Sequence, residues 1–379
     1  MHERQALGGK LLTKPFWVLL AFALIGGMLL LKRFLFGLGA VTNLSDGYPW
    51  GIWIVYDVLV GTALGCGGYA LALLVYIFNK GEYHPLVRSA LMTSMFGYTL
   101  AVVSIFIDIG RYWQMHNVFM PGYLNLNSVM FEVASCIGTY VLVLWIEFSP
   151  TFLEKWKNPG LSKRLNKVLF LFIALGVLLP TMHQSSLGSL MIIAGEKLSP
   201  IWQTMWLPLL FLTSAITMGY AVVIFEALFT AVALKRPLDE TPLLAKLSVV
   251  MIPLLVIFLG VRFGDLVVRG QMGNIFSDPL LGFFFVLENL LFVIPLLILL
   301  SKEMRSRSTT LFWAAGALLL AGSLYRFDTF LVAFDPGPGY HYFPSASELL
   351  ITVGIISVEI LAYLIFVKRL PILPAVKHS

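Results

Sequence analysis

Apolar runs of about 20 residues recur from one end of this chain to the other, and they constrain its fold more than any other feature. A helix of that length spans the roughly 30 Å hydrocarbon core of a bilayer. Because a backbone inside the bilayer must satisfy its own hydrogen bonds, each run is expected to be helical. Hydrophobic residues make up 59% of the chain and charged residues 12%, whereas soluble domains are roughly 45 to 50% apolar. A water-soluble fold is therefore excluded.

The pattern predicts an all-α integral membrane protein with about ten transmembrane helices. Residues 1–379 are expected to form a single polytopic domain, with no separate soluble domain between the spans. The first run is too long for the apolar core of a signal peptide and lacks a small-residue cleavage site, so it is expected to remain as an anchor. The predicted spans are 16–36, 52–78, 89–110, 128–149, 166–190, 204–233, 244–268, 279–301, 309–332 and 347–367.

The distribution of positive charge predicts the orientation of the chain. Successive spans place alternate loops on opposite sides, and nineteen of the 26 Lys and Arg residues fall on one side. Cytoplasmic loops carry an excess of Lys and Arg, so both termini are assigned to the cytoplasm: residues 1–15 and the tail after the last span, within 347–379. These residues also account for the net charge of +6, so no nucleic acid partner is expected. The predicted location is the bacterial inner membrane.

Ionisable side chains are predicted near the outer ends of four consecutive spans. Their depth follows from counting residues from each span end at 1.5 Å per residue. Asp57 lies early in the second span, and Asp108 and Arg111 lie at the end of the third. Glu132 begins the fourth span, and His183 comes late in the fifth, which runs outward. Ionisable residues inside a bilayer are costly and often functional, and a shared depth favours one site.

His183 is the leading candidate for proton exchange, because histidine has an unperturbed pKa of roughly 6.5. It follows Pro180, which can interrupt a helix and free backbone carbonyls, and it precedes the amide of Gln184. Each candidate also has a structural interpretation as a buried, paired side chain. Asp108 and Arg111 are three residues apart, so a simple ion pair is an alternative for them.

Other polar residues lie deeper in the predicted spans or in later ones. Glu147, Glu226 and Tyr140 are candidates for a proton path toward the cytoplasm. The alternative is that such residues join helices by hydrogen bonds. The later spans carry Glu288 and an outer-side charged group, which consists of Arg262, Asp265, Arg326 and Asp328.

The cysteines and histidines limit the cofactors that the chain is expected to hold. Its two cysteines, Cys66 and Cys136, are too few for an iron–sulfur cluster with four thiolate ligands. Only one of the six histidines, His183, falls inside a predicted span, whereas a haem within the membrane would normally need two. We therefore expect no haem, no iron–sulfur cluster and no metal site in this chain.

Several segments of the chain resemble a known family of membrane proteins. They are Tyr48-Pro49-Trp50-Gly51, Asn79-Lys80-Gly81, Tyr83 to Arg88, Asp108 to Trp113, Leu165 to Val168, Pro180 to Leu190, the loop Phe334 to Pro344, and Leu370 to Pro374. Together they resemble the NrfD-like membrane subunits of the polysulfide reductase type. Among these, the chain is most similar to the Hyb-type (HybB-like) subunits of periplasmic nickel–iron uptake hydrogenases, and the similarity runs essentially from end to end.

The resemblance implies two four-helix bundles, 52–190 and 204–332, flanked by the first and last helices, and again no haem. It also implies a respiratory subunit that passes electrons from a periplasmic, ferredoxin-like iron–sulfur subunit to menaquinone. That partner would connect the chain to the large and small subunits of a nickel–iron hydrogenase. In this family the quinone binds in the first bundle, near the iron–sulfur side. The residues at the matching positions are Asp57, Asp108, Glu132 and His183. The candidates for quinone binding are Asp57, Asp108, Arg111, His183 and Gln184.

The predicted mechanism gives His183, Asp57 and Glu132 the role of supplying protons to the quinone oxygens, with proton translocation as a further step. Enzyme activity is then a property of the hydrogen:quinone oxidoreductase complex, not of the isolated chain. Two alternatives remain: a secondary ion or solute transporter, and a passive membrane anchor of a redox complex. Transporter sites lie near the midplane of the membrane, so the outer-face cluster disfavours the first. A passive anchor would not need ionisable residues inside the bilayer, which are energetically unfavourable there.

Overall fold

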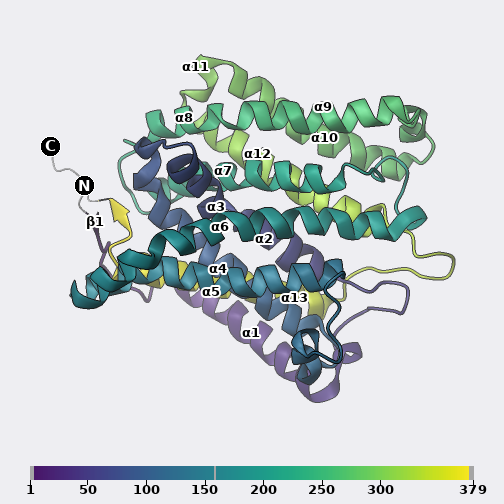
Figure 1. Cartoon of the computed structure of the whole chain (residues 1–379), viewed down its shortest axis with the longest axis horizontal. Coiled ribbons are helices and arrows are strands. Elements are labelled where there is room, and N and C mark those ends of the chain that lie inside the picture. Colours follow the sequence, from purple (N-terminus) through teal and green to yellow (C-terminus); the bar gives the residue numbers. More distant parts are fainter. Residues whose placement is uncertain (1–3, 158, 375–379) are drawn as a thin grey trace. The chain divides into compact units, whose positions relative to one another are not determined.

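The computed structural model describes residues 4–157 and 159–374, and it confirms the all-helical membrane fold (Figure 1). Within these residues ten helical segments are long and apolar enough to cross a membrane. The segments are Lys14–Phe36, Trp53–Ile77, Gly81–Asp108, Val129–Lys155, Pro159–Lys197, Leu207–Ala233, Thr241–Val268, Pro279–Leu300, Ser308–Val332 and Ala346–Arg369. Hydropathy therefore predicted every one of these spans. The two four-helix bundles and the cytoplasmic location of the termini stay predictions.

Most spans consist of one α-helix, and the others combine shorter elements. The α-helices are α1 (Lys14–Phe36), α2 (Gly61–Leu64), α3 (Gly67–Ala72), α4 (His84–Asp108), α5 (Val129–Lys155), α6 (Pro159–Ala194), α7 (Leu207–Ala233), α8 (Thr241–Val249), α9 (Met251–Val268), α10 (Pro279–Leu300), α11 (Lys302–Arg305), α12 (Ser308–Phe327) and α13 (Ala346–Arg369). Three π-helical segments are η2 (Trp53–Val60), η3 (Leu73–Ile77) and η8 (Asp328–Val332). Short 3₁₀ segments are η1 (Leu38–Ala40), η4 (Gly81–Tyr83), η5 (Tyr112–Phe119), η6 (Gly195–Lys197) and η7 (Met272–Phe276).

The third span begins earlier than its hydropathy predicts. The apolar run starts near residue 89, but α4 begins at His84. Pro85 is compatible with this start, because a proline in the first turn of a helix loses no hydrogen bond and has a suitable backbone angle. The prediction that His183 is the only histidine inside a span is therefore wrong, since His84 is also inside one. His2 and His378 lie outside the described residues.

The described chain forms two compact units, which are considered separately. The first unit contains residues 4–65, 91–157, 159–176 and 336–374. In it α1 packs along α13, and the glycines of the two helices meet: a Cβ at Gly26 would lie 3.0 Å from the Cα of Gly354. Small residues allow such close helix packing in membranes. Beside these helices the short strands β1 (Arg4–Gln5) and β2 (Leu373–Pro374) pair antiparallel.

The second unit contains residues 66–90 and 177–335. Its central helix is α7, which packs against α3, α9 and α12. Gly219 of α7 permits the approach to α3, because a Cβ there would lie 2.6 Å from the carbonyl oxygen of Cys66. Helix α10 lies against α9 and α12 (Figure 1). Its N-terminus is capped by Asp278, whose carboxylate accepts hydrogen bonds from the backbone amides of Leu280 and Leu281.

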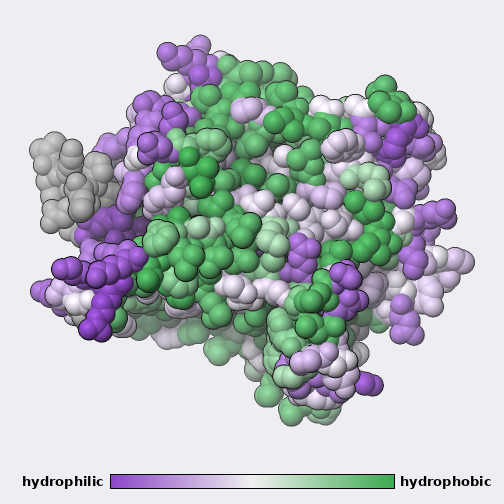
Figure 2. Space-filling model, viewed as in Figure 1, coloured by the Kyte–Doolittle hydropathy of each residue, from purple (hydrophilic) through white to green (hydrophobic). Residues whose placement is uncertain are grey.

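Large apolar side chains are exposed along the middle of the helices. On α9 and α10 they include Val256, Ile257, Phe283, Val286 and Leu290. On the face shown in Figure 2, hydrophobic side chains cover the central part of the helices, and hydrophilic ones gather toward the helix ends. Exposed apolar side chains of this extent are stable only against lipid. The surface therefore agrees with the ten-span assignment.

The contact between α1 and α13 gives a direct test of the packing in the first unit. Gly354→Leu would force the two backbones apart, and overpacking of this kind costs about 1 to 3 kcal/mol. We expect a lower unfolding temperature for the purified subunit. Gly27→Leu is the matched control, because a Cβ at Gly27 meets no atom within 4 Å. Equal unfolding temperatures for the two variants would contradict the close packing.

Candidate functional site

The carboxyl group of Asp57 is held inside the first unit by a π-helical segment and by the last helix. Asp57 lies in η2, where its side chain is buried. The hydroxyl of Thr352, from α13, lies 3.5 Å from Asp57 Oδ2 as a hydrogen-bond donor. π-helical turns are uncommon and occur often at functional sites. Asp57 is therefore buried within a span, and its roles in quinone binding and proton supply stay predictions.

The start of this span is fixed by a hydrogen-bond network around Glu348. Glu348 Oε2 accepts hydrogen bonds from the backbone amides of Asn43, at 3.0 Å, and Ser345, at 2.8 Å. Its Oε1 accepts the hydroxyl of Tyr342 at 2.6 Å, and Tyr342 Oη accepts the Ile52 amide at 2.8 Å. One buried carboxylate thus joins the loop before η2 to the start of α13.

Two of the segments that carry the family resemblance meet in this network. A Cβ at Gly51 would lie 2.7 Å from the hydroxyl oxygen of Tyr342, so only glycine fits there without a shift. Burial, and then the hydrogen bond to Glu348, raises the pKa of Tyr342 above its usual value. The phenol therefore stays protonated at neutral pH and remains a donor to Glu348.

A buried arginine, Arg33, holds the C-terminal end of α4 in the first unit. Its side chain is 1% exposed. Its Nε donates to the carbonyl of Ile107 at 2.7 Å, and its Nη2 donates to that of Ile109 at 2.6 Å. The last carbonyls of a helix have no partner within the helix, so Arg33 satisfies them. The guanidinium also lies over the ring of Tyr112, 5.3 Å from its centroid.

In the sequence, Asp108 lies between Ile107 and Ile109, whose carbonyls Arg33 binds. Its Oδ1 is buried and receives no hydrogen bond from any described residue. Arg33 interacts with this carboxyl group electrostatically, whereas no ion pair between Asp108 and Arg111 is found in the described part of the chain. The simple ion-pair alternative for these two residues is therefore not supported. Sequence reasoning overlooked Arg33, although a charged residue at the end of an apolar run was a usable signal.

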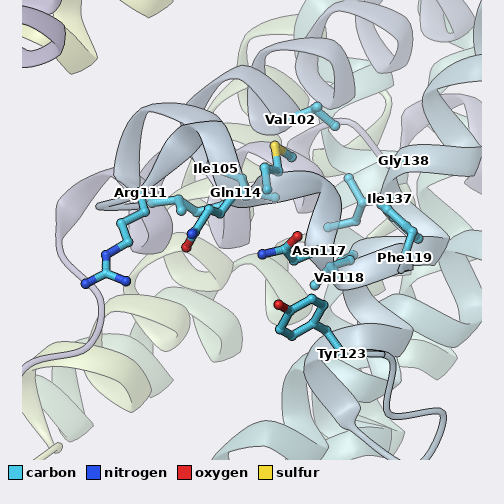
Figure 3. A pocket seen from close by; sticks show the side chains of 13 residues that line it. Val102, Ile105, Arg111, Gln114, Asn117, Val118, Phe119, Tyr123, Ile137 and Gly138 are labelled. Carbon is cyan, nitrogen blue, oxygen red and sulfur yellow. The ribbon is translucent and has the colours of Figure 1, made fainter. Parts of the chain in front are cut away.

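A pocket of about 470 Å³ lies beside the end of α4 in the first unit (Figure 3). Its walls come from the end of α4, from η5 and the turn after it, and from α5. The lining residues are Val102, Ile105, Ile109, Arg111, Gln114, Met115, Asn117, Val118, Phe119, Tyr123, Ala134, Ile137 and Gly138. Figure 3 shows the amides of Gln114 and Asn117 and the hydroxyl of Tyr123 in the same region of the pocket, with the guanidinium of Arg111 extending away from them.

This pocket combines apolar walls with a few polar groups, as sites for small molecules usually do. Its volume falls in the roughly 300 to 1,000 Å³ range of such sites. Phe119 and Tyr123 are exposed, so the pocket opens at the surface of the unit. Of its lining, sequence reasoning had identified only Arg111, because neutral amides in a short loop carry no distinctive signal.

Glu132 occupies the first turn of α5, behind the cap that Ser128 forms by accepting the Phe131 amide at 3.5 Å. It is half-buried. A carboxylate in the first turn of a helix is stabilised by the helix dipole, which gives Glu132 a sufficient structural role. Its predicted role in proton supply stays a prediction.

His183 and Gln184 belong to the second unit, where both are fully buried on α6. The Gln184 Oε1 accepts a hydrogen bond from Arg326 Nη2 at 3.2 Å. Helix α6 continues through Pro180, so the break expected at this proline does not occur. The hydroxyl of Thr181 instead binds the Val177 carbonyl, at 2.8 Å. A back-bonded hydroxyl helps to satisfy the carbonyls near a proline within a membrane helix.

The predicted proton-path residues occupy both units. In the first unit Tyr140 is buried, with its ring edge-on to Tyr98 and the centroids 4.5 Å apart. Glu147 lies directly against Gly176, and its Oε1 receives no hydrogen bond from the described residues. Glu226 lies on α7 of the second unit. A path through these residues stays a prediction. No group of three metal-binding side chains occurs among the described residues.

Replacement of Arg33 tests whether it holds the end of α4. Arg33→Gln would leave the carbonyls of Ile107 and Ile109 without their partner, at a cost of about 1 to 3 kcal/mol. We expect a lower unfolding temperature and faster proteolysis near residues 109–123. Lys32→Gln is the control, because this substitution removes the same charge from an exposed side chain. Equal loss of stability in both variants would show that net charge, not the cap, is responsible.

Comparison with known proteins assigns the chain to a family. The family described as polysulphide reductase, NrfD, matches residues 40–333. The chain is 46% identical to the probable Ni/Fe-hydrogenase 2 b-type cytochrome subunit of Escherichia coli, over 100% of this chain and 97% of the relative. It is 34% identical to the menaquinone reductase integral membrane subunit of Nitratidesulfovibrio vulgaris, over 46% of this chain and 42% of the relative. The chain therefore belongs to the NrfD family, as a multi-pass protein of the inner membrane.

Proposed function

We propose that this membrane subunit of a redox complex binds menaquinone near the periplasmic face and passes electrons to it from a periplasmic iron–sulfur subunit. That partner would receive them from the large and small subunits of a nickel–iron hydrogenase. Two relatives support the proposal, since one is named as a hydrogenase 2 subunit and the other as a menaquinone reductase subunit. Proton translocation coupled to this electron transfer is part of the proposal.

The pocket at α4, η5 and α5 is the observation that carries this proposal. Its apolar walls suit a quinone ring and the start of an isoprenoid tail, and its opening at the surface permits entry from the lipid. Gln114, Asn117 and Tyr123 offer hydrogen-bond donors to the two quinone oxygens. Such donors fix the orientation of a ligand in an otherwise apolar site.

Reduction of a quinone to a quinol takes up two electrons and two protons. The buried carboxyl groups of the same unit, Asp57 and Asp108, are the proposed proton donors. Asp108 is the better placed of the two, because its neighbours Ile109 and Arg111 both line the pocket. The proposed proton exchange by His183 is supported by its burial beside Gln184, whose amide is fixed by Arg326. Glu132 stays a further candidate.

The name of the Escherichia coli relative includes a b-type cytochrome, so the fit of a haem to this chain needs a test on its residues. A haem buried in the membrane needs two axial ligands at nearly the same depth. Among the described residues, the histidines inside spans are His84 and His183.

These two histidines lie at different depths in the second unit. His183 is two residues from Thr181, which contacts Tyr69 at 2.7 Å. Tyr69 precedes the end of η3 at Ile77 by about 12 Å of helix. His84 lies beyond that end, at the start of the next span. This separation supports the proposal that His84 and His183 do not hold one haem between them.

The absorption spectrum of the purified complex tests the expected absence of haem. We expect no Soret band and no change in the α-band region on addition of dithionite, beyond what cytochrome-free control membranes show. The haem content of the isolated subunit, determined as the pyridine haemochrome, supplies a second measurement. One haem per subunit would contradict the prediction.

Filling the pocket tests the proposed quinone site. Gly138 lines the pocket, and a Cβ added to it would meet no atom within 4 Å. Gly138→Phe on α5 would therefore place a phenyl ring inside the pocket. We expect hydrogen-driven reduction of a menaquinone analogue to fall about tenfold or more, a loss of about 1.4 kcal/mol. Hydrogen oxidation with a soluble viologen dye should not change, because it does not require the membrane subunit.

Leu142→Phe is the matched control for this experiment. Leu142 lies four residues further along α5 and is exposed, outside the pocket lining. The quinone-linked rate of this variant should equal that of the native complex. Quinone reduction that survives in Gly138→Phe membranes with a normal amount of assembled complex would contradict the pocket assignment.

A further inference from the structure

Three ionisable side chains lie together inside the second unit, and none of them lines the proposed quinone pocket. Arg262 comes from α9, Glu288 from α10 and Asp328 from the junction of α12 with η8. Glu288 and Asp328 are fully buried, and Arg262 is 4% exposed. Charges at this level of burial in a membrane helix are costly and are usually paired or functional. The functions proposed above make no use of these residues.

The carboxyl group of Glu288 is ion-paired with Arg262, and its Oε2 accepts two hydrogen bonds. Arg262 Nη2 lies 3.0 Å from Oε1 and donates to Oε2 at 3.3 Å, whereas Oε1 accepts no hydrogen bond from the described residues. The indole Nε1 of Trp202 donates to Oε2 at 3.0 Å. The guanidinium is also flanked by the rings of Phe285 and Tyr325, each 4.9 Å from its central carbon. Donors of this kind stabilise the ionised form of a carboxyl group, so Glu288 is the anion of the cluster.

Asp328 has a different environment. Neither of its carboxyl oxygens receives a hydrogen bond from an N–H or O–H group of the described residues. Its segment η8 packs against α10, which carries Glu288, and the two carboxyl groups interact electrostatically. Two ionised carboxylates cannot form a hydrogen bond with each other. A hydrogen bond between them requires one proton.

The charges of the cluster do not balance if both acids are ionised. Two carboxylates and one guanidinium leave one negative charge in a low-dielectric interior, which is strongly unfavourable. Arg326, the buried arginine of α12, donates to Ser214 and Gln184 and to the carbonyls of Phe211 and Gly322. A proton on Asp328 removes the excess charge and supplies the missing hydrogen bond to Glu288.

Other unsatisfied polar atoms surround the cluster. The hydroxyl of Tyr325, the Nε of Arg262 and the Oδ1 of Asn289 are buried and have no hydrogen-bond partner among the described residues. All three residues are at least nine-tenths buried. Buried polar groups of this kind are usually satisfied by internal water, which makes about three hydrogen bonds. Water at this place would also give a proton a route to and from the acid.

We propose that Asp328 and Glu288 form a hydrated proton-binding site within the membrane-spanning part of the second unit, with Arg262 as its fixed counter-charge. Asp328 carries the proton and donates it in a hydrogen bond to the ionised Glu288. Internal water exchanges the proton, so the site takes up and releases one proton without any change in covalent structure. The inference does not depend on the quinone pocket, and either can fail without the other.

Infrared difference spectroscopy of the complete complex in lipid nanodiscs tests this proposal. A protonated carboxyl group gives a carbonyl stretch that is separate from the carboxylate bands and shifts in D₂O. Subtraction of the Asp328→Asn spectrum from the native spectrum should leave one such band at neutral pH. Asp265→Asn is the matched control: Asp265 lies on α9, is ion-paired with Arg269 at 2.6 Å, and should contribute no protonated band.

The variants also differ in their expected stability. An asparagine amide donates to Glu288 as the protonated acid does, so Asp328→Asn should assemble and keep the native unfolding temperature. In Glu288→Gln the remaining acid, Asp328, becomes the counter-ion of Arg262, so the protonated band should vanish there too. Absence of the band from the native protein, or failure of Asp328→Asn to assemble, would overturn the proposal. Sodium-dependent stabilisation lost in Asp328→Asn would overturn it in favour of a metal cation.

Discussion

The structure depends on one requirement of the bilayer, that every buried charge or backbone polar group finds its partner inside the protein. Three buried arginines show how the requirement is met. Arg33 satisfies the carbonyls at the end of α4, Arg262 neutralises Glu288, and Arg326 binds the side chain of Gln184. A guanidinium has five donors in a fixed plane, so one such residue can join several elements at once. These contacts position the helices that carry the candidate sites.

The spans were predictable because hydropathy and helix length are local properties of the sequence. Each of the ten predicted spans overlaps an observed one, and most of their ends agree within a few residues. The larger differences occur where helices continue beyond the apolar core, as at His84 and at the start of α6. There the chain is helical because of its end residues and packing, not because of hydropathy.

The site was only partly predictable, because its geometry depends on contacts between residues far apart in the chain. Asp57 and Asp108 were recognised as buried acids, and both belong to the first unit. The partner of the α4 end, Arg33, lies 74 residues before Ile107, and Glu348 lies 305 residues after Asn43. The capping box of Ser345 and Glu348 is readable from the sequence. Its additional bonds to Asn43 and Tyr342 are not.

The packing of α1 on α13 determines when, during synthesis of the chain, the first unit can form. Helix α1 has its glycine contact with α13, so it enters the lipid long before its partner has been synthesised. The network around Glu348 and the contact between Thr352 and Asp57 also cannot form until α13 has been synthesised. The first unit therefore closes only after α13 has been synthesised. A chain cut short before residue 346 would expose these polar groups, which a quality-control protease could recognise.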